Sequence, residues 1–170
     1  MTRPPFPPLK PGDVDAVSAQ LRRPARNVIG IAARCTCGAP TVVATAPRLS
    51  DGTPFPTLYY LCHPAATAAI SKLEANGMMA EFTELLADDE QIQQSYARAH
   101  ESYLADRDSV AVVPEVADFS AGGMPNRVKC LHALAAHALA AGPGVNPIGD
   151  LALERAEWSP AVCECAAFLG

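Results

Sequence analysis

Apolar residues form short runs in the first third of the chain and change to a helical spacing near residue 64. The runs are rich in β-branched residues and are separated by segments that contain Gly and Pro. Such runs are typical of strands. Neighbouring strands joined by short connections usually pair with each other. The pattern therefore predicts a three-stranded antiparallel sheet, formed by residues 27–34, 41–46 and 57–62.

After Pro64 the spacing favours helices. Ala68, Ile70, Leu73 and Met78 approximate one helix face, and Gly77 is a typical helix-ending residue. Acidic residues at the start of residues 13–23 and arginines at the end predict a helix there as well. Further helices are expected in residues 79–87, after Asp89, in residues 126–141 and from Asp150. The sequence thus predicts an α+β fold, with a small three-stranded antiparallel sheet near the N-terminus packed with about five helices.

The composition is that of a folded protein. Hydrophobic residues make up 49% of the 170 residues and charged residues 18%, which separates this chain from disordered ones. A chain of this length buries about 70% of its unfolded surface, so it can form a core without cross-links. We expect a Pro-rich N-terminal arm, residues 1–12, followed by one α+β domain, residues 13–170.

The charge and the N-terminus restrict the partners and the location. A net charge of −5 gives no general attraction to duplex nucleic acid or to anionic lipid. No run reaches the ~20 apolar residues that a membrane helix needs. Prolines interrupt the N-terminal segment, which therefore does not resemble a signal peptide. We expect a cytoplasmic protein that binds neither duplex nucleic acid nor a membrane.

Six cysteines are the most informative residues in this setting. Four of them form two Cys-x-Cys pairs, Cys35 with Cys37 and Cys163 with Cys165. A reducing compartment favours a metal site or reactive thiols over structural disulfides. Residues i and i+2 of an extended segment point to the same side, so each pair could supply two thiolates together. One candidate ligand set is therefore these four cysteines.

Several ordered motifs resemble a known family. They are Ala33-Arg-Cys35 with Gly38 and Pro40, Asp51-Gly-Thr-Pro-Phe-Pro-Thr-Leu-Tyr-Tyr60, Ser120-Ala-Gly-Gly-Met-Pro-Asn-Arg-Val-Lys-Cys-Leu-His132, and Ala141-Gly-Pro-Gly-Val-Asn-Pro-Ile-Gly-Asp150. Together they resemble the bacterial domain of unknown function family 501 over most of residues 13–150. The resemblance implies a family but no activity, because the family is defined without a known function.

The resemblance also draws attention to His63. It implies that the third strand ends in Cys or His before a proline, and His63 holds that position here. A position that accepts either residue is typical of a zinc ligand. The ligand set that follows is Cys35, His63, Cys130 and Cys163, with Cys37 and Cys165 as alternatives. The metal would join the hairpin, a helix start and the C-terminal tail. Zinc is the expected ion, and an iron–sulfur cluster is the alternative.

Cys130 supports an alternative function. If Asn126 caps the helix predicted for residues 126–141, Cys130 lies near free amide groups that favour a thiolate. The protein would then be an enzyme that uses the Cys130 thiolate, or an open metal site, on a small anionic substrate. We expect His132 to be a poor partner for Cys130, because helical positions i and i+2 point about 200° apart.

The anion in this alternative would be held by basic residues. The candidates are Arg34, Arg127 and Lys129, of which the last two lie next to the Gly-Gly loop before the predicted helix. In the non-catalytic alternative the surface would serve an unidentified protein partner. The sequence leaves open whether the protein is an enzyme.

Overall fold

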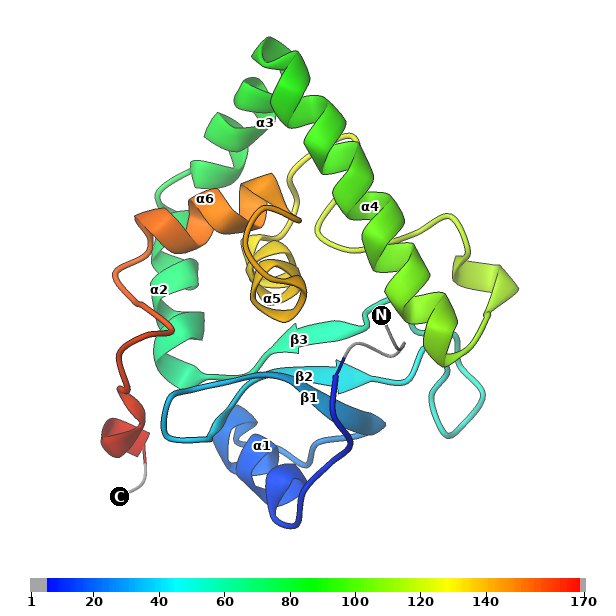
Figure 1. Ribbon diagram of the computed structural model, residues 1–170, viewed down its shortest axis with the longest axis vertical. Coiled ribbons are helices and arrows are strands. Elements are labelled where there is room, and N and C mark those ends of the chain that lie inside the picture. Colours follow the sequence, from blue (N-terminus) through cyan, green and yellow to red (C-terminus); the bar gives the residue numbers. More distant parts are fainter. Residues whose placement is uncertain (1–5, 169–170) are drawn as a thin grey trace.

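The computed structural model describes residues 6–168 and confirms an α+β fold (Figure 1). Its described part contains six α-helices, two short 3₁₀ helices and the predicted three-stranded sheet. The elements are, in order, α1 (Asp13–Leu21), β1 (Val28–Arg34), β2 (Pro40–Thr45), β3 (Tyr59–Leu61), α2 (Pro64–Ala75), α3 (Met78–Asp88), α4 (Glu90–Val110), η1 (Pro114–Val116), α5 (Leu131–Ala141), α6 (Pro147–Arg155) and η2 (Cys165–Phe168).

The sheet has the order β1-β2-β3 and both pairs are antiparallel. Every residue of the central strand β2 is buried, because α1 covers one face and α5 the other (Figure 1). Successive side chains of a strand point to opposite faces. Val43 accordingly packs in the cluster beneath α1, whereas Val42 and Ala44 belong to the larger core on the α5 side.

The N-terminal arm is partly anchored. Residues 1–5 of the predicted Pro-rich arm lie outside the described residues. Phe6 is buried and its ring contacts the ring of Tyr59 edge to face, at 6.4 Å between centroids. The arm also passes close to Gly30, where an added Cβ would lie 2.4 Å from the Phe6 ring. Glycine in β1 thus makes room for the arm.

The helix predicted for residues 126–141 begins later, at Leu131. Tertiary contacts explain the difference, because they use the backbone groups of the preceding residues. The Val128 N–H donates to Thr83 Oγ1 (3.3 Å), and the Tyr96 hydroxyl donates to the carbonyl of Arg127 (3.0 Å). The prediction that Asn126 caps this helix is therefore wrong, and Cys130 occupies the N-cap position.

The last α-helix also differs, beginning at Pro147 instead of Asp150. The side-chain oxygen of Asn146 accepts a hydrogen bond from the Gly149 N–H at 2.9 Å, which is a typical N-cap contact. Proline at the first helical position fits this start, since its missing N–H would have no helical partner.

His137 lies in the core between α5 and the sheet. It is fully buried, its ring stacks on Tyr59 at 5.9 Å between centroids and meets Tyr103 edge to face at 5.1 Å. Asn146 Nδ2 donates to Nδ1 at 3.1 Å, so this nitrogen carries no proton. Burial lowers the pKa of His137 to about 4, because the charged ring would lose its hydration.

This burial predicts an acid-sensitive core. The pKa of His137 is about 4 in the folded protein and about 6.5 when unfolded, so the unfolded chain alone binds a proton between these values. The stability that depends on a neutral ring is fully present above pH 6.5 and is lost as the pH falls toward 4. Between pH 7.5 and pH 5.0 this loss should be about 2 kcal/mol.

Urea unfolding of wild type and His137→Phe at both pH values measures the effect. A chelator is present in all samples, so that release of a metal does not contribute to the difference. The variant should lose about 2 kcal/mol less than wild type over this interval. Equal losses in both proteins would contradict the assignment to His137.

Candidate metal centre

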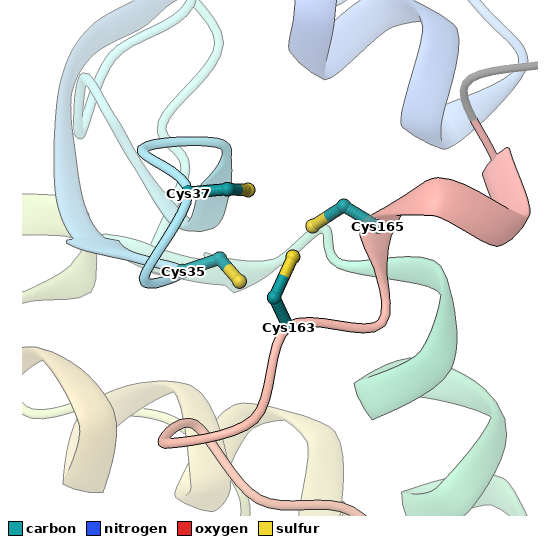
Figure 2. A group of neighbouring side chains, drawn as sticks. All are labelled: Cys35, Cys37, Cys163 and Cys165. Carbon is teal, nitrogen blue, oxygen red and sulfur yellow. The ribbon is translucent and has the colours of Figure 1, made fainter.

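The turn between β1 and β2 carries the first pair of cysteines. Cys35 N–H donates to the Ala39 carbonyl and Gly38 N–H donates to the Cys35 carbonyl, both at 2.8 Å. Gly38 has a φ of 92°, a left-handed conformation that glycine adopts without strain. The tight turn holds the Cys35 and Cys37 thiols on the same side, as the Cys-x-Cys spacing predicts (Figure 2).

The second pair lies on the C-terminal tail, which leaves α6 and runs beside α2 toward the hairpin (Figure 1). Trp158 fixes this path. Its side chain is buried, and its ring packs against the ring of His63 at 5.5 Å between centroids. The tail then presents Cys163 and Cys165 toward the hairpin thiols (Figure 2). Cys165 is buried, whereas Cys163 is exposed.

The four sulfur atoms converge at one point. All Sγ atoms of Cys35, Cys37, Cys163 and Cys165 lie within 4.8 Å of one another, and all four are free thiols (Figure 2). Zn–S bonds of about 2.3 Å in a tetrahedron would place the sulfur atoms about 3.8 Å apart. The cluster can therefore hold a metal ion through small side-chain movements. We call these residues the four-cysteine cluster.

The thiols of this cluster influence each other's protonation. Burial alone would raise the pKa of Cys35, but a hydrogen bond from the Cys37 N–H and contacts with neighbouring side chains, including the Cys165 thiol, lower it to about 7. Burial and the thiols of Cys37 and Cys35 raise the pKa of Cys165. The Cys35 thiolate thus forms readily while the Cys165 thiol keeps its proton, because adjacent negative charges repel. A bound cation would remove this repulsion.

His63 contacts the cluster through a hydrogen bond. It is fully buried at the start of α2, and its Nδ1 accepts from the Ala66 N–H at 3.4 Å. In a neutral ring the proton then resides on Nε2, which lies 3.2 Å from Cys165 Sγ. Burial lowers the pKa of His63, which favours this neutral form. His63 is therefore placed to donate to a Cys165 thiolate and orient it.

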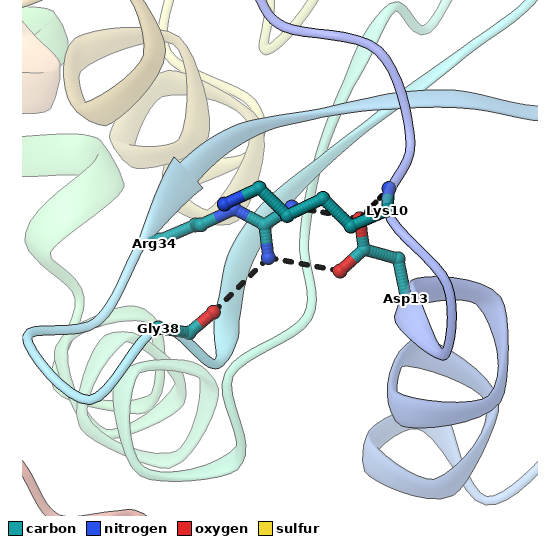
Figure 3. A network of polar contacts seen from close by, with 4 residues as sticks. All are labelled: Lys10, Asp13, Arg34 and Gly38. Carbon is teal, nitrogen blue, oxygen red and sulfur yellow. Dashed lines mark hydrogen bonds and ion pairs between the residues drawn. The ribbon is translucent and has the colours of Figure 1, made fainter.

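An ion pair between Arg34 and Asp13 links the hairpin turn to α1 (Figure 3). The Arg34 guanidinium donates to both oxygens of the Asp13 carboxylate, at 2.9 and 2.7 Å, and also to the Gly38 carbonyl at 3.0 Å. The Lys10 N–H donates to the same carboxylate at 2.7 Å. The hydrogen bond from Arg34 lowers the pKa of Asp13, whose side chain is almost fully buried. Arg34 thus connects α1 to the turn that carries Cys35 and Cys37.

We expect Asp13→Asn to weaken both the fold and the turn. The substitution removes the charge that the partly buried Arg34 guanidinium pairs with, at a cost of about 2 kcal/mol in unfolding free energy. Because the same guanidinium holds the Gly38 carbonyl, zinc affinity should fall by about tenfold. Urea unfolding and zinc competition with a chelator measure the two effects.

Asp15→Asn is the matched control for this substitution. Asp15 lies in the same first helical turn of α1 but is exposed, so its replacement should change either quantity little. Equal effects of the two substitutions would show that helix electrostatics, and not the contact with Arg34, is responsible.

A second group of metal-binding side chains lies at the start of α5. A carboxylate oxygen of Glu74, the sulfur of Cys130 and a ring nitrogen of His132 lie within 4.8 Å of one another. His132 Nδ1 is 3.1 Å from Glu74 Oε1. The hydrogen bond to His132 lowers the pKa of Cys130, and the same contact raises the pKa of His132 to about 9.

The expectation that His132 would be a poor partner for Cys130 is therefore wrong. It assumed that both residues lie inside a helix. Cys130 has extended backbone angles, φ −150° and ψ 108°, and precedes the first helical residue. Its side chain can consequently turn toward His132, whereas side chains at positions i and i+2 inside a helix point to opposite faces.

The structure separates residues that the sequence analysis grouped together. Cys35 and Cys163 belong to the four-cysteine cluster with the alternative ligands Cys37 and Cys165, whereas Cys130 belongs to the second group. Arg127 and Lys129 are exposed on the loop before α5. The assignment of individual ligands and anion-binding residues stays a prediction.

Sequence reasoning missed three residues with a clear place in these sites: Asp13, Glu74 and Trp158. Asp13 was interpreted only as a helix-start residue. Glu74 belongs to an acidic stretch that is usually solvated. Trp158 is the one tryptophan of the chain and follows a helix, which is a usable signal that the tail packs against the core.

A groove of about 1080 Å³ runs along the surface beside the second group. It lies between α1, β3 and the first turns of α2 and α5, and both metal-binding groups contribute to its wall. Its wall includes Arg22, Arg23, Tyr60, Thr67, Cys130 and His132.

Comparison with protein families matches residues 31–154 to the family described as "Protein of unknown function (DUF501)". The chain belongs to this family. The match confirms the resemblance that the sequence motifs indicate and includes Cys35, Cys37 and the whole second group, while Cys163 and Cys165 follow the matched region. Comparisons with the curated proteins and with the solved structures give no match. Across the described residues, the helices are too short or too polar to cross a membrane.

Proposed function

We propose that this member of the DUF501 family is a zinc protein in which the four-cysteine cluster binds one Zn²⁺ ion. The convergence of four thiol sulfur atoms within 4.8 Å is the observation that carries the proposal. Zinc prefers four tetrahedral ligands at structural sites, and four thiolates are a common ligand set for it. Their negative charge also explains why a cation would stabilise the cluster.

The proposed role of the ion is to tie the tail to the hairpin. Four protein ligands would fill the coordination sphere, which leaves no position for a substrate and is typical of a structural site. The ion would connect residues 35–37 with residues 163–165, closing a long loop of chain. Constraining long loops stabilises a fold mainly through the entropy of the unfolded chain.

The proposed location is the cytoplasm. Six free thiols, four of them adjacent, would form disulfides in an oxidising compartment, whereas a reducing compartment keeps them available for a metal. The nearby donor of His63 suits a zinc-bound thiolate, as hydrogen bonds to ligating groups are common around zinc. Four thiolates can also hold an iron–sulfur cluster, and the experiment below separates these metals.

The test is elemental analysis of the protein purified without oxygen and without added metal. We expect at least one zinc per chain, with the four thiols of the cluster reacting with a thiol reagent only after chelation. If the analysis finds iron together with acid-labile sulfide, the bound group is an iron–sulfur cluster and not a zinc ion. A metal-free protein with two disulfides or with six titratable thiols would overturn the proposal.

A further inference from the structure

Three donor atoms of different types meet at the junction of α2 and α5. Glu74 comes from the last turn of α2, and Cys130 and His132 come from the start of α5. Zinc bonds to nitrogen and oxygen of about 2.1 Å in a tetrahedron would place these two ligand atoms about 3.4 Å apart. The observed separation of His132 Nδ1 and Glu74 Oε1 is 3.1 Å. The two atoms therefore need to move apart only slightly to bind the same ion.

The hydrogen bonds of His132 orient its ring for metal binding. Nε2 lies 3.2 Å from the carbonyl oxygen of Thr67 and 3.1 Å from Ser71 Oγ. A carbonyl oxygen can only accept, so Nε2 carries a proton. A neutral ring then has its lone pair on Nδ1, the nitrogen that faces Glu74. Metal-binding histidines are commonly fixed in this way, by a carbonyl that accepts from the other ring nitrogen.

The other two donors are also held in place. The Leu131 N–H donates to Glu74 Oε1 at 2.8 Å, which fixes the carboxylate against the first residue of α5. Cys130 precedes the helix in an extended conformation, and its N–H lies 3.3 Å from the Gly122 carbonyl that accepts it. None of the three side chains is fully exposed. Preorganised donors of this kind lower the entropic cost of binding an ion.

The second group opens onto the groove. Cys130 and His132 line the groove, together with Thr67 and Tyr60. Three protein ligands would leave one coordination position of a zinc ion for water or for another ligand, as in catalytic zinc sites. The arginines 22 and 23 lie on the same groove and would favour an anionic ligand at this position.

We propose that Glu74, Cys130 and His132 form a second divalent metal site, separate from the four-cysteine cluster, with one coordination position open to the groove. Zn²⁺ fits the mixed sulfur, nitrogen and oxygen donors. In the absence of a metal, Nδ1 of His132 donates to the Glu74 carboxylate, so the same contacts also describe an ion pair between α2 and α5.

Zinc stoichiometry in defined variants distinguishes a metal site from an ion pair. The full chain is equilibrated with buffered Zn²⁺ and analysed for bound metal. Wild type should hold two zinc ions, whereas Glu74→Gln and His132→Asn should each hold one. Glutamine keeps an oxygen for the Leu131 N–H, and circular dichroism checks that both variants are folded. His100→Asn is the matched control, because His100 bonds to Ser120 outside both groups, and it should hold two.

The two sites remain distinguishable in this experiment. A Cys163→Ser, Cys165→Ser double variant should lose the ion of the four-cysteine cluster and keep the second ion. If the double variant binds one ion that is lost when His132→Asn is added to it, the second site stands even if the four-cysteine cluster binds no metal. For the second ion, Glu74→Gln should weaken binding by more than about 100-fold, the upper range for outer contacts, because it replaces a direct ligand.

Cobalt provides a second readout. Co²⁺ bound by one thiolate gives a weaker sulfur-to-metal absorption than Co²⁺ bound by four. The double cysteine variant should therefore retain a weak thiolate band that disappears when Cys130→Ser is added to it. One metal per chain in wild type, unchanged in Glu74→Gln and His132→Asn, would overturn the second site. Rapid alkylation of Cys130 that slows in His132→Asn, with no second metal, would instead assign the group to a thiolate–imidazolium pair.

Discussion

Cys165→Ser should abolish tight zinc binding at the four-cysteine cluster and detach the C-terminal tail, while the sheet and its covering helices stay folded. Cys165 is the buried thiol of the tail and the one that His63 contacts. Replacing a direct ligand should lower zinc affinity by more than about 100-fold, since replacing even an outer contact costs 10- to 100-fold. Neither buried core cluster contains any of the four cysteines. Trp158 joins the main cluster from the tail, but the sheet and helix residues of the core should stay packed without the metal.

Trp158 reports the state of the tail. It is the one tryptophan of the chain, and its buried ring packs against His63. When the tail leaves this position, the indole becomes hydrated and its emission should shift to longer wavelength. Trypsin gives a second measurement, because Arg155 is the last basic residue of the sequence. Cleavage after Arg155 should be slow in the zinc-loaded protein and fast in Cys165→Ser.

Cys62→Ala is the control for the loss of a thiol. Cys62 packs beneath α1, and burial raises the pKa of its thiol to about 12, so it stays protonated. The variant should keep the zinc content, the emission of Trp158 and the resistance of Arg155 to trypsin. A Cys165→Ser protein that binds zinc as tightly as wild type would show that Cys165 is not a ligand. An unchanged emission would show that Trp158 alone docks the tail.

The sequence-based predictions were correct where local interactions determine the structure and wrong where residues distant in the sequence determine it. The strands were predictable because turn residues and β-branched runs act locally, and the hairpin turn of Gly38 is one of these signals. The helix start was not predictable, because distant groups such as Thr83 and Tyr96 use the backbone of residues 127 and 128. The error at this start also produced the wrong expectation for His132.

The candidate sites divide in the same way. Each Cys-x-Cys pair is a local feature, although a tight turn at Gly38, and not the extended segment assumed from the spacing, holds Cys35 and Cys37 on the same side. The convergence of the two pairs depends on the path of the tail, which Trp158 fixes through contacts with a distant helix start. Glu74 had no signal at all, because its partners at the start of α5, residues 130–132, lie 56 to 58 residues away along the chain.

We expect Gly149→Ala to be the substitution that destabilises this fold most through the addition of a single methyl group. Gly149 lies on the face of α6 that crosses α5, and an added Cβ would be 2.2 Å from the Leu134 carbonyl oxygen and 2.8 Å from Ala138 Cβ. Real Cβ atoms do not approach a backbone oxygen so closely. Backbone cannot turn aside as a flexible side chain can, so the two helices must separate. An alanine here should therefore destabilise the protein even though it favours a helix elsewhere.

We expect Gly149→Ala to lower the free energy of unfolding by about 3 kcal/mol and the melting temperature by about 10 °C. Glu154→Ala on the exposed side of α6 is the control and should change stability by less than about 0.5 kcal/mol. Thermal and urea unfolding measure both variants. Since α5 also contacts β3 and begins at Cys130, separation of the helices reaches the second group. A Gly149→Ala protein as stable as wild type would show that α5 and α6 cross at a greater distance than the structure describes.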